Sequence, residues 1–154
     1  MYAFTHLLKI LSGIVLLHMN IIVNYWAVLG GAVFLFVAGG IWYGPMFGKV
    51  WMKITGADKL SKEEQKEAMK GVGMMYVLQF VLSLLTSYVF YNFVKAWNGG
   101  GYQVAFFVWL GFMMPQAAGV IWDSQKGLRM KKFLIVAGYQ LITLLVLGYI
   151  FSIW

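Results

Sequence analysis

The chain has 154 residues, of which 62% are apolar, 18% aromatic and only 11% charged. Soluble domains average about 45–50% apolar and about 25% charged residues, so this composition excludes an ordinary soluble protein and predicts a membrane protein. There is no Cys, which excludes disulfides and thiol chemistry. The net charge of +7 comes from Lys with a single Arg, so we expect anionic lipid at the cytoplasmic face, and no nucleic acid, as the charged partner.

Residues 1–20 form an amphipathic extension ahead of the first long apolar stretch. Apolar side chains such as Leu7 and Leu11 share one helical face, whereas Lys9 lies on the other. Lys9 would lie in the middle of a span, so we expect an N-terminal interfacial helix. A dispensable extension before Met19 is an alternative, and a signal peptide is another, although no small-x-small cleavage site follows the apolar run.

Four long apolar stretches follow, and none contains Asp, Glu, Lys or Arg. They cover residues 21–43, 71–94, 102–122 and 133–154. As helices they would be roughly 31 to 36 Å long, which is enough to cross a hydrocarbon core of about 30 Å. The sequence therefore predicts an all-α, polytopic membrane protein whose residues 21–154 form a four-transmembrane-helix bundle.

The segment after the first stretch carries a proline and then an amphipathic pattern. Pro45 has no amide hydrogen and disfavours helix at Gly44, so the first span should kink or break there. Apolar residues from Phe47 to Ile54 then recur at helical spacing, which predicts a short amphipathic helix in the cytoplasmic headgroup layer.

A second cytoplasmic helix is predicted by its start signal. Ser61 and Glu64 have the spacing of a capping box, so a helix should begin at Lys62. Nothing in the charged stretch breaks the pattern, and glycine is tolerated in membrane helices. We therefore expect one continuous helix from Lys62 to Val94, roughly 50 Å long.

The basic residues predict the orientation of the chain in the cell membrane. Ten of them follow the first and third stretches, whereas only Lys9 and Lys95 lie on the other side. By the positive-inside rule, both basic loops should be cytoplasmic and both termini extracytoplasmic.

Several motifs together resemble a known family. They are Asn24-Tyr25-Trp26-Ala27-Val28-Leu29, Trp42-Tyr43-Gly44-Pro45 with Phe47-Gly48-Lys49 and Trp51-Met52, Trp109-Leu110-Gly111-Phe112, and Phe133-Leu134-Ile135 with Ala137-Gly138-Tyr139. The chain from Asn20 to Trp154 resembles the small bacterial membrane proteins grouped as domain of unknown function 1761. The resemblance implies a four-helix membrane protein, and it implies no activity, ligand or catalytic residue.

Polar side chains recur on one face of the second stretch, in line with Phe90. We call the following residues the polar seam: Tyr76, Gln79, Ser83 and Thr86, joined by Gln116, Gln140 and Thr143 from the later stretches. One interpretation is a path that binds or passes a small neutral solute. The other is that these side chains form hydrogen bonds between helices, as is common in membrane proteins.

Small residues predict close helix packing. Gly31, Gly40, Gly119 and Gly138 are the candidates, and Gly40, Gly44 and Gly48 recur every four residues, although Pro45 interrupts that face. We expect a homo-oligomer through the first and third stretches, with Gly31 and Gly119 at the contact. A weak echo between residues 38–42 and 118–122 could reflect either duplication or chance.

The spans lack ionisable residues, which argues against ion-coupled transport. The acidic residues lie in loops beside Lys, and no nucleophile, base and orienting group can be assembled from them, so we expect no enzyme, metal or cofactor. The leading interpretation is a non-catalytic accessory or scaffold protein that self-associates or joins a larger membrane complex. The alternative is an uncoupled pore or facilitator for a small neutral solute along the polar seam.

Overall fold

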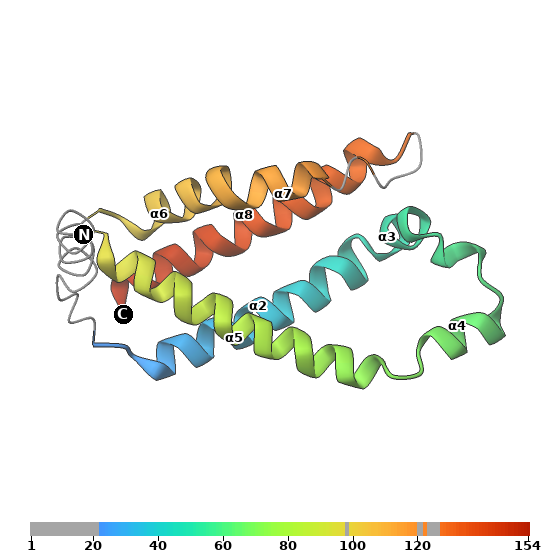
Figure 1. Cartoon of the computed structure of the whole chain (residues 1–154), viewed down its shortest axis with the longest axis horizontal. Helices are drawn as coiled ribbons and strands as arrows, with labels where there is room; N and C mark the ends of the chain where they lie inside the picture. Colours follow the sequence, from blue (N-terminus) through green and yellow to red (C-terminus); the bar gives the residue numbers. More distant parts are fainter. Residues whose placement is uncertain (1–21, 98, 120–121, 123–126) are drawn as a thin grey trace, which may run out of the picture.

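A computed structural model describes residues 22–97, 99–119, 122 and 127–154 of the chain (Figure 1). This part consists of helices and short connections, with no strand among the described residues, and so agrees with the predicted all-α class. The predicted interfacial helix in residues 1–20 lies outside the described ranges.

The first half of the chain forms one long helix, two short surface helices and a second long helix. Their bounds are α2 Tyr25–Ile41, the π-helix η1 Trp42–Met46, α3 Gly48–Thr55, the 3₁₀ turn η2 Ala57–Lys59, α4 Lys62–Ala68 and α5 Val72–Ala96. Asn24 begins α2 because its Oδ1 accepts hydrogen bonds from the backbone N–H groups of Trp26 and Ala27.

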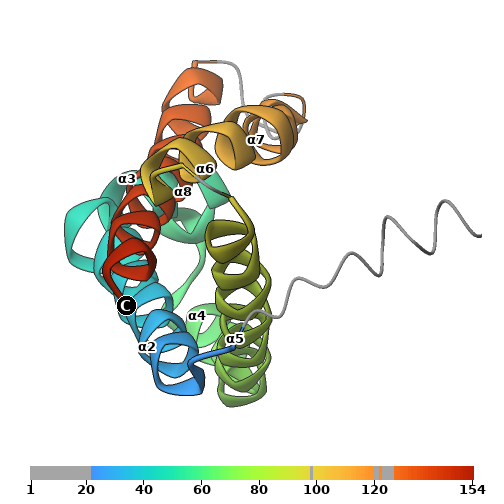
Figure 2. The same cartoon turned by 90° about the vertical axis from the view of Figure 1, so that its left-hand side faces the viewer.

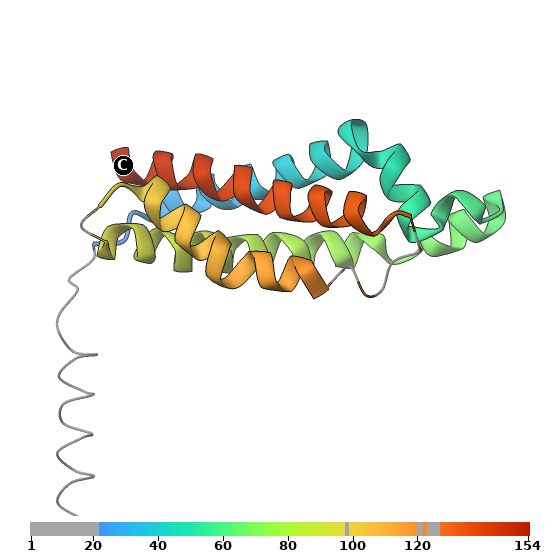
Figure 3. The same cartoon turned by 90° about the horizontal axis from the view of Figure 1, so that it is seen from above.

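The second half forms a helical hairpin. Its elements are α6 Gly101–Val108, the π-helix η3 Trp109–Met113, α7 Met114–Gly119 and α8 Arg129–Ile153. The helix from α6 through η3 to α7 runs antiparallel to α8, as Figures 1 and 3 show. Gly101 and Gly148 bring the backbones of α6 and α8 into close contact, because a Cβ on either glycine would collide with the other residue's carbonyl.

The molecule is therefore built from two helix pairs. Figure 2, which looks along the bundle from the end that carries the C-terminus, shows α2 and α5 beside one another and α6 and α8 above them. A buried hydrogen bond of 2.7 Å from the Ser87 hydroxyl to the Val28 carbonyl joins α5 to α2. Phe90, Tyr91 and Phe151 fill the core where the two pairs meet, with the Tyr91 and Phe151 ring centres 5.2 Å apart.

Three of the helices are long and apolar enough to cross a membrane: Tyr25–Met46, Val72–Ala96 and Arg129–Ile153. They agree with three of the predicted spans. The predicted span over residues 102–122 is helical from Gly101 to Gly119, but it is not among these three, so the fourth crossing stays a prediction.

The predicted continuous helix from Lys62 to Val94 is wrong. The capping box is present, with the Glu64 backbone N–H donating to Ser61 Oγ at 3.2 Å and the Ser61 N–H donating to Glu64 Oε2 at 2.7 Å. However, α4 ends at Ala68 and α5 starts only at Val72, with Gly71 between them at φ +86°. Glycine adopts this left-handed conformation without a steric penalty, and α4 buries no residue that would hold it in line with α5.

The described basic residues gather at one end of the bundle. Figure 1 shows α3, α4 and the start of α8 at this end, with the C-terminus and the connection from α5 to α6 at the opposite end. Among the described residues, Lys95 alone carries a basic side chain at that opposite end.

Candidate functional site

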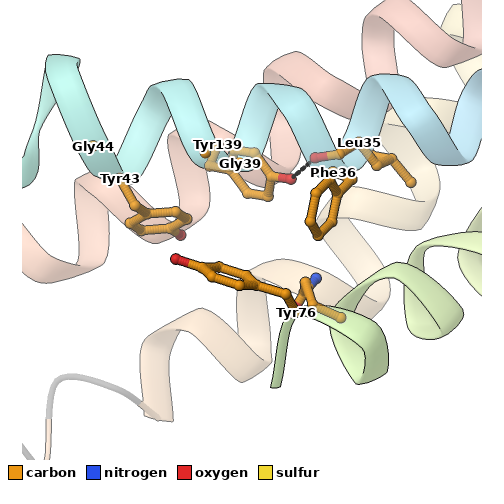
Figure 4. Close-up of a pocket in the computed structure, with 9 residues that line it drawn as sticks. Leu35, Phe36, Gly39, Tyr43, Gly44, Tyr76 and Tyr139 are labelled. Carbon is orange, nitrogen blue, oxygen red and sulfur yellow. Dashed lines mark hydrogen bonds between the residues drawn. The ribbon is translucent and has the colours of Figure 1, made fainter. Parts of the chain in front are cut away.

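Three neighbouring cavities follow the polar face of α5. The first cavity, about 700 Å³ in volume, lies toward the basic end between α2, α5 and α8 (Figure 4). It is lined by Leu35, Phe36, Gly39, Gly40, Tyr43, Gly44, Tyr76, Gln79 and Tyr139. The figure shows the phenol groups of Tyr43 and Tyr76 turned toward one another across this cavity.

Hydrogen bonds from aromatic side chains to backbone carbonyls hold the helices around the first cavity together. The Tyr139 hydroxyl donates to the Leu35 carbonyl at 2.9 Å and so joins α8 to α2 (Figure 4). The Tyr139 ring lies 5.4 Å from the Tyr43 ring and 6.1 Å from the Trp42 ring, measured between ring centres. The Trp42 indole N–H donates to the Ile135 carbonyl at 3.0 Å, which holds the start of η1 against α8.

The π-helix η1 explains how Tyr43 reaches the cavity. Pro45 cannot donate a backbone hydrogen bond, and its ring disturbs the preceding turn, so the helix widens rather than continuing as an α-helix. Phe47 N–H closes the widened turn by donating to the Trp42 carbonyl at 3.0 Å, five residues back. The α-helix therefore gives way to a π-helix around the predicted position, and the helical backbone ends at Phe47, with φ −119° and ψ 5°. The predicted amphipathic helix then appears as α3.

A second π-helix repeats this arrangement on α6–α7, and the sequence reasoning missed it. Trp109 begins η3, and its indole N–H donates to the Ala137 carbonyl of α8 at 2.9 Å. The two π-helices share the pattern Trp-x-Gly-x-Met, which runs from Trp42 to Met46 and from Trp109 to Met113. The structural counterpart of Trp42 is therefore Trp109, whereas Trp122, to which the sequence echo pointed, is exposed.

The middle cavity, about 150 Å³, contains most of the predicted polar seam. The seam residues that line it are Gln79, Ser83, Thr86, Gln140 and Thr143. It shares Leu35, Gln79 and Tyr139 with the first cavity, so the two adjoin.

The seam hydroxyls do not bond between helices, contrary to one of the two interpretations of the sequence. Ser83 donates to the Gln79 carbonyl at 2.9 Å, Thr86 to Leu82 at 2.9 Å, and Thr143 to Tyr139 at 2.7 Å. Each of these acceptors lies four residues earlier on the donor's own helix. The bonds between helices come instead from other side chains. Ser87, Trp42, Trp109 and Tyr139 donate to backbone carbonyls, and Tyr91 and Ser152 accept from the backbone N–H groups of Asn24 and Gly101.

Gln140 is the unusual member of the seam. Its Oε1 atom is buried and has no hydrogen-bond partner within the described part of the chain. Buried polar atoms in proteins are nearly always hydrogen-bonded, and an unpaired one is costly. The side chain therefore presents an acceptor that a bound molecule can satisfy.

The apolar cavity, about 370 Å³, lies on the far side of the middle cavity. It shares Thr86, Met113 and Leu144 with the middle cavity. Its other lining residues are Leu85, Val89, Phe90, Phe93, Val108 and Phe112. Phe90, which shares the polar face of α5 in the sequence, thus marks where that face becomes apolar.

Two predicted seam residues stand outside the middle cavity. Tyr76 lines the first cavity instead, together with Gln79. Gln116 is exposed on α7 and lines none of the three cavities.

The four packing glycines have different surroundings. Gly31 is buried, and a Cβ there would collide with Ser87 Oγ and lie 2.7 Å from Phe151 Cζ. This glycine therefore allows close packing within the chain. The predicted contact with another copy at Gly31 is wrong. A Cβ on Gly138 would lie 3.6 Å from the Trp42 ring. Gly40 and Gly119 have open space around the Cβ position.

Among the residues that the structure describes, no charged side chain lines any of the three cavities. Within the described ranges there is also no group of three or more His, Asp or Glu residues that could hold a metal ion. The expectation that the protein is not an enzyme stays a prediction.

Comparison with known families gives one match. The sequence model of a family described as "Protein of unknown function (DUF1761)" matches residues 26–152, which is more than half of the chain. The comparisons with curated proteins and with solved structures gave no match.

Proposed function

Because the chain belongs to the DUF1761 family, whose description carries no activity, we propose a function from the three cavities. The protein binds an uncharged molecule along the polar seam and lets it cross the membrane without an energy source. One observation carries this proposal. The seam residues Gln79, Ser83, Thr86, Gln140 and Thr143 face a cavity that adjoins two others, and they do not bond to neighbouring helices.

The chemistry of the lining supports an uncharged ligand. A charged molecule would find no opposite charge in any of the three cavities, and burying an unpaired charge is very costly. Ion-coupled transporters place Asp, Glu, Lys, Arg or His along their path, and none of these lines the three cavities among the described residues. Passage along it would therefore follow the concentration gradient of the ligand.

We place the protein in the cell membrane as a multi-pass protein with four spans. The end that carries α3, α4 and the start of α8 is then cytoplasmic, in contact with anionic lipid, and both termini are extracytoplasmic. The gathering of the described basic residues at that end supports this orientation.

A pair of glycine substitutions tests the proposal. Gly40 lines the first cavity and has open space at its Cβ position, so Gly40→Phe should fill the cavity without moving the backbone. Gly73→Phe is the matched control, because Gly73 also has open space and lines none of the three cavities.

The measurement is the permeation of uncharged solutes, from glycerol and urea to short-chain alcohols, into liposomes containing the full chain. We expect the protein to speed the entry of at least one solute. Gly40→Phe should reduce that rate to the value of protein-free liposomes, and Gly73→Phe should not. Equal rates with and without the protein for every solute would contradict the proposal.

The accessory or scaffold role stays a second candidate, through self-association. The observation that favours it is the open space at Gly119 and Gly40, where the backbone of a neighbouring copy could approach closely. In native mass spectrometry from nanodiscs, Gly119→Leu should then weaken a dimer or trimer. A monomer of the unmutated protein at every lipid composition would rule this candidate out.

A further inference from the structure

We propose that the molecule bound along the seam is a neutral lipid-like amphiphile, with an apolar chain and one hydrogen-bond donor group such as a hydroxyl, and that the donor pairs with Gln140 Oε1. This inference rests on the proposed function and names its ligand class. It follows from how polarity changes along α5, from the unpaired acceptor and from the exposure of the apolar cavity.

The three cavities lie in order along α5, from the basic end to the opposite end. The face of α5 that lines them runs from Tyr76 to Phe93, which is roughly 26 Å at the rise of an α-helix. A bound molecule can therefore be long and narrow, and its parts meet different surroundings in each cavity.

The apolar cavity favours a molecule with an apolar part over a solute that is polar over its whole surface. Of the described residues that line it, Thr86 alone has a polar side chain, and the Thr86 hydroxyl already donates to the Leu82 carbonyl. A molecule such as glycerol would lose its hydrogen bonds to water there and gain none. A hydrocarbon chain has no hydrogen bonds to water to lose, and it gains contacts with Phe90, Phe93 and Phe112.

The middle cavity selects a donor group. The hydroxyl protons of Ser83, Thr86 and Thr143 are used within their own helices, so their oxygens remain as acceptors. Gln140 adds a buried acceptor with no partner inside the described part of the chain. A ligand hydroxyl would satisfy it, whereas an ether oxygen would not.

The apolar cavity also provides a route from the bilayer. Val89, Phe93 and Phe112 line it and are at the same time 40%, 48% and 66% exposed, on helices whose outer surface is apolar. A hydrocarbon chain can thus enter between α5 and α6–η3 directly from the lipid. The middle cavity, about 150 Å³, leaves room for only a small head group.

The test uses a photoactivatable long-chain alcohol, hexadecanol with a diazirine in its chain, and the full-length protein in nanodiscs. We expect crosslinks to peptides that contain residues 85–93 or 108–113. Unlabelled hexadecanol should compete about tenfold better than hexadecyl methyl ether, which has the same chain and an oxygen but no donor.

Two glutamine variants separate the role of the acceptor from general effects. Gln140→Leu keeps the side-chain size and should abolish the preference for the alcohol over the ether. Gln116→Leu is the matched control on the exposed surface of α7 and should keep it. The comparison of alcohol with ether in the unmutated protein decides the proposal even where Gln140→Leu fails to fold.

Equal competition by the alcohol and the ether, or a full preference in folded Gln140→Leu, would overturn this inference. Crosslinking without a preference for the alcohol, combined with solute permeation that depends on Gly40, would contradict the inferred ligand class. The proposed function would then still stand. Neither crosslinks at the cavities nor any permeation would remove both.

Discussion

Trp42 and Trp109 occupy the same position in two π-helices, and the indole N–H of each donates to a backbone carbonyl of α8. The acceptors are Ile135 at 3.0 Å and Ala137 at 2.9 Å. Two residues along an α-helix correspond to a rotation of roughly 200°, so the two indoles hold α8 from nearly opposite sides. Tyr139, which lines the first cavity, lies two residues after Ala137 and adds a third bond, because its hydroxyl donates to the Leu35 carbonyl at 2.9 Å.

Removing either indole donor should loosen α8 to a similar extent. Trp42→Phe and Trp109→Phe keep an aromatic ring and lose one hydrogen bond, so each should lower the free energy of unfolding by about 0.5 to 1.5 kcal/mol. Thermal unfolding in detergent, followed by circular dichroism, measures the change. Trp26→Phe is the control, because Trp26 is 78% exposed and should have no effect. Equal stability of all three variants would contradict the clamping of α8.

Gly31 should tolerate no side chain, whereas its neighbour Gly30 should. A Cβ on Gly31 collides with Ser87, and Gly31→Ala should therefore destabilise the protein by about 1 to 3 kcal/mol through overpacking. A Cβ on Gly30 would lie 3.8 Å from the Trp154 ring, an ordinary contact, so Gly30→Ala should be neutral. The same unfolding assay distinguishes the two variants, and a neutral Gly31→Ala would show that Gly31 does not pack within the chain.

The start of α4 should depend on pH. Hydrogen bonds from the Ser61 backbone N–H and hydroxyl stabilise the charged form of Glu64, which lowers its pKa below the ordinary value of 4.5. The capping interaction is therefore complete above pH 4.5 and is lost as the pH falls through the lowered pKa of the folded chain. The Ser61 amide resonance, followed by NMR from neutral pH downward, reports this titration.

Two variants of the cap test the two partners separately. Glu64→Gln keeps the capping geometry without the charge and should remove the pH dependence of the Ser61 amide. Ser61→Ala should raise the pKa of Glu64 toward its ordinary value, because the hydroxyl is gone. A Glu64 pKa of 4.5 in the unmutated protein would contradict the cap as the structure shows it.

Single cysteines test the proposed orientation, since the chain has none of its own. Lys66→Cys lies on α4 and Trp97→Cys after the end of α5, both at exposed positions. In intact cells an impermeant thiol reagent should label position 97 and not position 66. The reverse result would place the basic end outside and overturn the orientation.

The sequence alone determined the elements whose cause is local. Continuous apolar stretches predict the long helices, Pro45 predicts the break in the first α-helix, and the spacing of Ser61 and Glu64 predicts the start of α4. The recurrence of polar residues on α5 likewise predicted a common face, because helical periodicity depends only on positions along the chain. The pattern Trp-x-Gly-x-Met was present too and could have revealed the second π-helix.

Only the tertiary structure decided what those faces meet. Whether the hydroxyls of Ser83 and Thr86 bond to another helix or line a cavity depends on how the two helix pairs lie against each other. Gly31 and Gly119 are the same residue in similar apolar stretches, yet one is buried against Ser87 and Phe151 and the other has open space. The break at Gly71 also escaped prediction. Glycine permits both a helical and a left-handed backbone, and only the structure shows that α4 buries no residue that would hold it in line with α5.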